Sequence, residues 1–203
     1  MPMFQHGFLA TIEAVRESMD GAMLDGHFGD ERLESDLMGG DLTWESSYAL
    51  PGERRPPNVR AELTLDWPTW SQSAVRSWQI DGNLDELPEV LIEVVLRVGE
   101  LAGRPDIDAV RRVLDTEGPD LGTGESFRLA APLLEQSFDY DLDTTGWALE
   151  FTYEGSYELT ESVIADVSLI EQAFEPIGPW VASMLVRLGD LRLEFTRRGD
   201  ERS

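Results

Sequence analysis

The sequence predicts an α+β fold, in which a mostly antiparallel sheet carries helices packed on one face. Several short segments alternate apolar and polar residues, as strands with one buried face do. Other segments repeat apolar residues at helical spacing, and six Trp, eight Phe and four Tyr supply enough apolar area for a core. We expect residues 1–203 to form a single domain with an N-terminal helical segment at 7–20.

In the first half, Pro and Gly mark the ends of the expected elements. Strands are expected at 42–48, 59–65 and 74–80, and helices at 87–101 and 105–115. The segment 87–101 is predicted to be a helix because one apolar stripe contains Leu87, Val90, Leu91, Val94, Val95, Val98 and Leu101. Residues 116–125 are polar and rich in Gly, so we expect a linker there.

In the second half, alternating residues predict a strand at 149–153, and Gly155 is expected to turn the chain into a further extended stretch at 157–159. Helical spacing then predicts helices at 161–174 and 180–188, which the proline-containing segment 176–179 interrupts. A last short strand is expected at 191–195.

One internal echo raises the hypothesis of two related strand-helix halves. Val95–Leu101 resembles Leu185–Leu191 position by position, and a preceding alternating segment recurs at nearly the same separation. A duplication that produced halves 40–103 and 125–193 would explain this echo. Amphipathic segments that end near a glycine also resemble one another by chance, so both interpretations stay open.

Charge is the most unusual property of the chain. It has 40 Asp and Glu residues against 16 basic residues, a net charge of -24, and every basic residue is Arg, so the chain is lysine-free. Such a field repels nucleic acid and anionic lipid, which excludes both as direct partners, and it attracts proteins with a basic face. The alternatives are the surface composition of a salt-adapted or GC-rich organism, and avoidance of lysine beside lysine-modifying machinery.

Several classes of chemistry are excluded by residue types. The chain is cysteine-free and lysine-free, which rules out thiol nucleophiles, Schiff bases and a phosphate-binding lysine. His6 and His27 are the two histidines, and both lie in the N-terminal segment. Without Cys, without an apolar run of membrane-spanning length and without a signal-peptide pattern, we expect a soluble, cytoplasmic protein.

The best candidate metal site is a weak match to a calcium-binding loop, and no other cofactor is predicted. Asp139, Asp141, Asp143 and Glu150 stand at the first, third, fifth and twelfth places of such a loop. The sixth place holds Thr144 instead of the glycine that the sharp turn requires, and the flanking segments are expected to be strands. The other interpretation is a solvated acidic hairpin loop.

Two groups of residues are candidates for contact with a partner. Trp67 and Trp70 flank a proline at a strand end, where we expect them to be exposed, although core packing is the usual role of strand tryptophans. Arg54, Arg55 and Arg60 form a basic island in a proline-stiffened loop. They suit an acidic partner or a second copy of this chain, and the alternative is local pairing with carboxylates.

These observations predict a non-enzymatic acidic interaction factor, such as an adaptor, inhibitor or immunity-type protein, that binds a protein partner through a surface patch. The alternative is a small-ligand-binding domain or a carboxylate-based enzyme, with a pocket between helix 87–101 and the sheet. A large apolar cavity with a buried carboxylate of raised pKa would favour the alternative. A filled core with a flat exposed patch would favour the interaction factor.

Overall fold

The computed structural model describes residues 6–26, 32–35, 40–52, 57–82, 86–139 and 144–196. It has an eight-stranded sheet in which neighbouring strands are antiparallel, together with helices, which confirms the predicted α+β fold. No helix in these ranges is long and apolar enough to cross a membrane.

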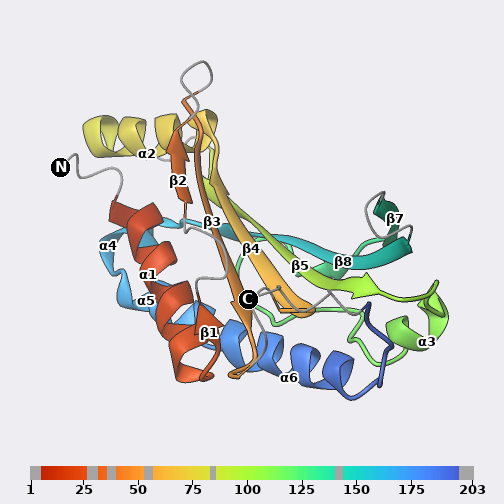
Figure 1. Ribbon diagram of the computed structural model, residues 1–203. Coiled ribbons are helices and arrows are strands. Elements are labelled where there is room, and N and C mark those ends of the chain that lie inside the picture. Colours follow the sequence, from red (N-terminus) through yellow and green to blue (C-terminus); the bar gives the residue numbers. More distant parts are fainter. Residues whose placement is uncertain are drawn as a thin grey trace, which may run out of the picture.

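The sheet has the strand order β1-β3-β4-β5-β8-β6 (Figure 1). In addition, β2 pairs with β3, and β7 pairs with β8. The strands are β1 (Asp25–Gly26), β2 (Arg32–Ser35), β3 (Leu42–Ala49), β4 (Val59–Trp67), β5 (Glu89–Leu101), β6 (Arg128–Leu129), β7 (Leu133–Asp139) and β8 (Thr144–Glu158). The helices are α1 (His6–Gly21), α2 (Thr69–Asp81), α3 (Ile107–Arg111), α4 (Glu161–Ala165), α5 (Ser168–Phe174) and α6 (Ile177–Gly189).

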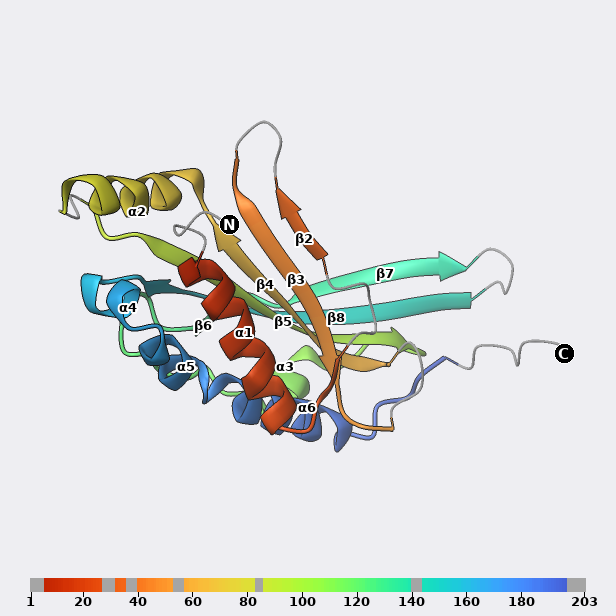
Figure 2. The same cartoon turned by 90° about the vertical axis from the view of Figure 1, so that its left-hand side faces the viewer.

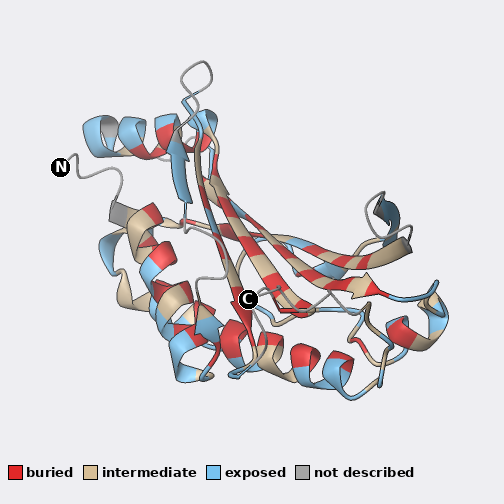
Figure 3. Ribbon diagram, in the orientation of Figure 1, coloured by how far each residue is buried: buried red, intermediate tan, exposed pale blue. Residues whose placement is uncertain are grey.

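The central strands bury every second residue, which gives the sheet two different faces. In β4 the odd-numbered residues from Val59 to Trp67 are buried, while the polar residues between them are half-exposed. Figures 1 and 2 show α1, α4, α5 and α6 gathered on one face, and Figure 3 shows the alternation of burial along the strands. We call the helix-covered side the core face and the opposite side the open face.

Aromatic side chains fill the space between the core face and the helices. Phe8 of α1 stacks on Trp67 with ring centroids 5.6 Å apart, and Tyr157 meets Phe174 of α5 edge-on at 5.1 Å. The Tyr153 hydroxyl donates a hydrogen bond to the Asp115 backbone carbonyl at 2.7 Å. Burial of these aromatic and aliphatic side chains is the main contribution to the stability of such a domain.

The predicted helix at 87–101 is wrong, because this segment is strand β5 at the centre of the sheet, between β4 and β8. Its core face is a run of branched apolar residues, namely Val90, Ile92, Val94, Leu96 and Val98. Leu91 and Val95 add apolar residues on the other face, and together the two faces produced an accidental helical stripe. Its β-branched residues favour a buried strand.

Other boundaries also differ from the predictions. The segment 74–80, predicted as a strand, belongs to α2, whose buried residues Ser71, Gln72 and Val75 recur at helical spacing. The strand β8 runs straight through Gly155, where a turn was expected. The predicted helix 105–115 is helical only as α3, and the expected strand at 191–195 is reduced to one bridge between Leu101 and Phe195.

The helices 161–174 and 180–188 are found as α4, α5 and α6, although α6 begins earlier than expected, at Ile177. The internal echo does not extend to the structure. Val95–Leu101 lies in a strand, whereas the matching Leu185–Gly189 lies in α6. The halves 40–103 and 125–193 therefore share no order of elements that would support a duplication.

Candidate functional site

The predicted cation site lies mostly outside the residues that the structure describes. Asp141 and Asp143 lie outside the described residues, as does the side chain of Asp139, in the connection between the antiparallel strands β7 and β8. The Glu150 carboxylate accepts a hydrogen bond from Arg97. Within the described residues, no group of three or more His, Asp or Glu side chains is placed to hold a metal ion.

The two tryptophans predicted as partner contacts are not equivalent. Trp67 is completely buried, because it continues the core-face alternation of β4, and its indole Nε1 donates to Ser71 Oγ at 2.9 Å. The expectation that it is exposed is therefore wrong. Trp70, in the first turn of α2, remains 40% exposed.

The basic island is only partly described. Arg54 and Arg55 lie outside the described residues. Arg60 lies on the open face of β4, where its guanidinium Nε contacts the Glu62 carboxylate at 2.6 Å. Arg60 is therefore held by its own strand, as the alternative of local pairing proposes.

The open face is where the structure gathers charge from strands that are distant in sequence. Its described carboxylates are Glu34, Glu45, Glu62, Asp66, Glu89, Glu93, Glu135, Glu150, Glu154 and Glu158, and its described arginines are Arg32, Arg60, Arg97 and Arg128. Arg97 binds Glu135 at 3.3 Å and also binds Glu150, so this cation is already engaged. Arg32 and Arg128 lie on the peripheral strands β2 and β6.

Glu93, in the middle of β5, is the centre of this charge. It lies directly opposite Glu154 in the β5–β8 register, where Cβ atoms are about 5 Å apart. Burial, together with the charges of Glu154, Asp66, Glu150 and Glu45, raises the pKa of its carboxyl group. Within the described residues no arginine forms an ion pair with Glu93. The neighbouring carboxylates therefore repel its negative charge from several sides.

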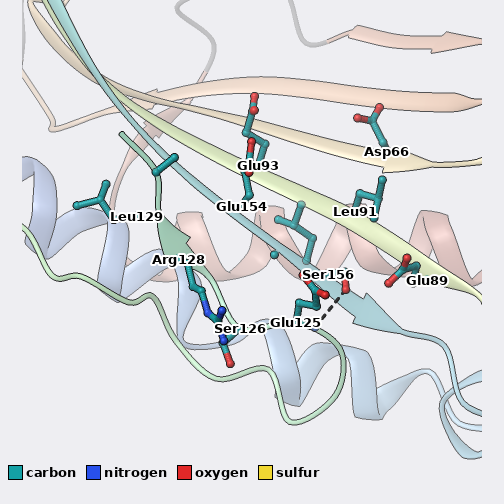
Figure 4. Close-up of a pocket in the computed structure, with 13 residues that line it drawn as sticks. Asp66, Glu89, Leu91, Glu93, Glu125, Ser126, Arg128, Leu129, Glu154 and Ser156 are labelled. Atoms are coloured by element: carbon teal, nitrogen blue, oxygen red, sulfur yellow. Dashed lines mark hydrogen bonds between the residues drawn. The ribbon is translucent and has the colours of Figure 1, made fainter. Parts of the chain in front are cut away.

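Two grooves meet at Glu93. The larger has a volume of about 560 Å³ and is lined by Asp66, Glu89, Leu91, Glu93 and Glu154 of the sheet and by part of the segment 125–130. The smaller, of about 350 Å³, lies on the other side of Glu93, against β3 and β4. Figure 4 shows Glu93 and Glu154 side by side in the larger groove, with Asp66 on the neighbouring strand.

The segment 125–130, which we call the strap, forms the wall of the larger groove beside β8. The Ser156 backbone N–H donates to the Glu125 carbonyl at 3.0 Å, and the Ala130 N–H donates to the Thr152 carbonyl at 2.8 Å. Between these bonds the Phe127 side chain is fully buried. The strap is therefore fixed to the sheet at both of its ends and in its middle.

Gly155 allows this close approach of the strap to β8. A Cβ atom at this position would lie 2.8 Å from the Glu125 carbonyl oxygen and 3.2 Å from the Phe127 nitrogen. A glycine inside a strand often marks such an approach by another backbone. This explains why the chain stays extended at Gly155, where the sequence suggested a turn.

The open face is suited to bind cationic side chains. Its described groups are carboxylates, arginines, hydroxyls and a few apolar side chains. Sequence reasoning missed Asp66, Glu93 and Glu154 because β5 was taken for a helix. The β-branched residues of β5, such as Val90, Ile92 and Val94, were the available signal for a strand.

Comparison with known proteins gives no match, whether with protein-family models, curated proteins or solved structures. The charges, grooves and contacts of the open face are therefore the basis for a functional proposal.

Proposed function

We propose that this chain is a non-enzymatic, cytoplasmic interaction protein that docks a basic protein partner on the open face of its sheet. The proposal depends on one observation, the position of Glu93 between two grooves and among Glu45, Asp66, Glu150 and Glu154. A cationic side chain placed there relieves the repulsion among these carboxylates. Binding of a protein with a basic face is therefore favoured both by direct attraction and by the reduced repulsion among these carboxylates.

Charge on the whole molecule supports the same partner class. The net charge of -24 repels nucleic acid and anionic membranes and steers basic proteins toward the surface. It also opposes association of two copies through their open faces, because both carry the same excess of carboxylates. A basic protein is therefore the favoured partner over a second copy.

The test is calorimetric titration of the protein with an arginine- and lysine-rich peptide at about 0.15 M salt. A variant with Asp66→Asn, Glu93→Gln and Glu154→Gln removes the central charges of the open face without changing side-chain size. We expect its affinity to fall by about tenfold or more, because close charge pairs contribute most to such binding.

The matched control removes the same number of charges from the helical side, through Glu17→Gln, Glu171→Gln and Glu175→Gln, which are all exposed. Its affinity should change by less than about twofold, since charges beyond a Debye length of about 8 Å are screened. If both variants lose the same affinity, binding follows net charge alone and the proposal is wrong.

A carboxylate-based enzyme is a second candidate, and the raised pKa of Glu93 in a groove is the observation that favours it. The predicted pocket between a helix 87–101 and the sheet does not form, because that segment is strand β5. For this candidate, Glu93→Gln would abolish turnover of a small substrate while leaving peptide binding intact. The interaction proposal instead expects no turnover by the wild-type protein and weaker peptide binding by Glu93→Gln.

A further inference from the structure

The larger groove has an apolar floor inside an acidic rim. Leu91 points to the open face and is 40% exposed. The strand register places Asp66 beside it on β4, and Glu89 and Glu93 precede and follow it on the same face of β5. Neighbouring positions on one face of a sheet are about 5–7 Å apart, so carboxylates surround an exposed aliphatic side chain.

The side of the groove beside β8 is also mixed in character. Ala130 of the strap lines the groove together with Glu125, whereas the neighbouring Leu129 packs against the core. The backbone bonds to Thr152 and Ser156 hold this wall in place, so a ligand does not have to order it. In Figure 4 the Arg128 side chain is directed away from Glu93 and Glu154 toward Ser126, which leaves the two carboxylates accessible.

We propose that this groove receives an arginine side chain of the partner polypeptide. Its aliphatic stem would lie on Leu91, and its guanidinium group would donate hydrogen bonds to carboxylates of the rim, with Glu93 and Glu154 at its centre. The inference rests on the proposed function, because it names the side chain by which the basic partner is recognised.

Arginine fits this groove better than lysine for two physical reasons. Its planar guanidinium has several N–H donors and can bond two carboxylates at once, whereas the lysine ammonium is a compact point charge. The guanidinium is also more weakly hydrated, so it loses less on entering a half-buried groove. The aliphatic stem of either residue can cover apolar surface, which is the role of Leu91 here.

The test compares three short basic peptides that differ only at one central residue, which is arginine, lysine or uncharged citrulline. Affinities are measured by NMR titration of the full chain. We expect citrulline to weaken binding by about tenfold or more and lysine by about threefold. Equal affinities for the arginine and citrulline peptides would overturn the inference.

The matched variants are Leu91→Ser and Leu133→Ser. Both residues are exposed leucines on the open face, at 40% and 52%, and only Leu91 lines the groove. Leu91→Ser should lower the affinity for the arginine peptide by about three- to tenfold, through loss of apolar contact with the stem, and Leu133→Ser should leave it unchanged. Equal effects of the two substitutions would contradict the groove assignment.

Failure of the inference can be told apart from failure of the proposed function. The arginine peptide could bind the open face with an affinity that neither Leu91→Ser nor replacement of its central arginine by citrulline changes. In that case the partner docks elsewhere on that face, and only the groove assignment is wrong. If no basic peptide binds the open face, both are wrong.

Discussion

Glu93 shows how a single residue links burial, charge and stability. Folding places its carboxylate opposite Glu154 and near Asp66, and its pKa rises above the ordinary value of 4.5. The folded state therefore holds the Glu93 proton more tightly than the unfolded state does. The stabilisation from this raised pKa is present at low pH and is lost as pH rises from about 4.5 through the raised pKa.

We expect Glu93→Gln to increase the free energy of unfolding at pH 7 by about 0.2–1 kcal/mol, because like charges placed opposite each other in a sheet destabilise by that amount. The gain should shrink as pH falls toward about 4, where the wild-type carboxyl takes up its proton. Urea unfolding at several pH values measures this. A loss of stability at pH 7 would mean that Glu93 is compensated by a cation.

Trp67 shows which side-chain burial can be predicted from residue patterns. The apolar residues of β4 follow odd numbers from Val59, and Trp67 continues that series. The alternation therefore predicted that Trp67 is buried. The adjacent Pro68 instead suggested a surface turn, which led to the wrong expectation. Whether the nearby Trp70 is exposed depends on how α2 leaves the sheet, which no local pattern specifies.

At the scale of elements, polar residues on the open face decided which strands were predictable. β3 and β4 carry Thr, Glu and Arg between their buried residues, so their alternation was clear. β5 carries Leu91 and Val95 on its open face, so its apolar residues do not alternate with polar ones. The central strand of the candidate site was therefore not predicted. The strap was not predictable, because its place depends on hydrogen bonds between segments distant in sequence.

The helices α1 and α6 cross in close contact, and this contact depends on Gly178. A Cβ atom at Gly178 would collide with the Ser18 backbone carbonyl, and the Gly178 N–H donates to Ser18 Oγ at 2.8 Å. The Ser18 hydroxyl in turn donates to the Glu175 carbonyl at 2.7 Å. Together these bonds hold two helices that are far apart in the chain.

We expect Gly178→Ala to lower the free energy of unfolding by about 1–3 kcal/mol, since the backbones must separate to accept the methyl group. Gly189→Ala in the last turn of α6 is the control, because no atom lies within 4 Å of its added Cβ. That change should be neutral or stabilising by up to about 1 kcal/mol. Thermal unfolding of both variants compares them, and a Gly178→Ala protein as stable as wild type would refute the close crossing.

At the scale of the whole molecule, sequence and structure contribute different information. The sequence established the large negative charge and the classes of partner that it repels. It did not locate the charge, because Asp66, Glu93 and Glu154 lie on three strands that only the fold brings together. The helical side is also acidic, so composition alone does not distinguish salt adaptation from a docking face.

The most direct test of the account is the footprint of an arginine-rich peptide on the backbone amides, mapped by two-dimensional NMR of the full chain. We expect the shifted amides to lie on β4, β5, β8 and the strap, centred on Glu93, with those of α1, α5 and α6 unchanged. A footprint on the helices, or shifts spread over every acidic segment, would contradict a docking site on the open face.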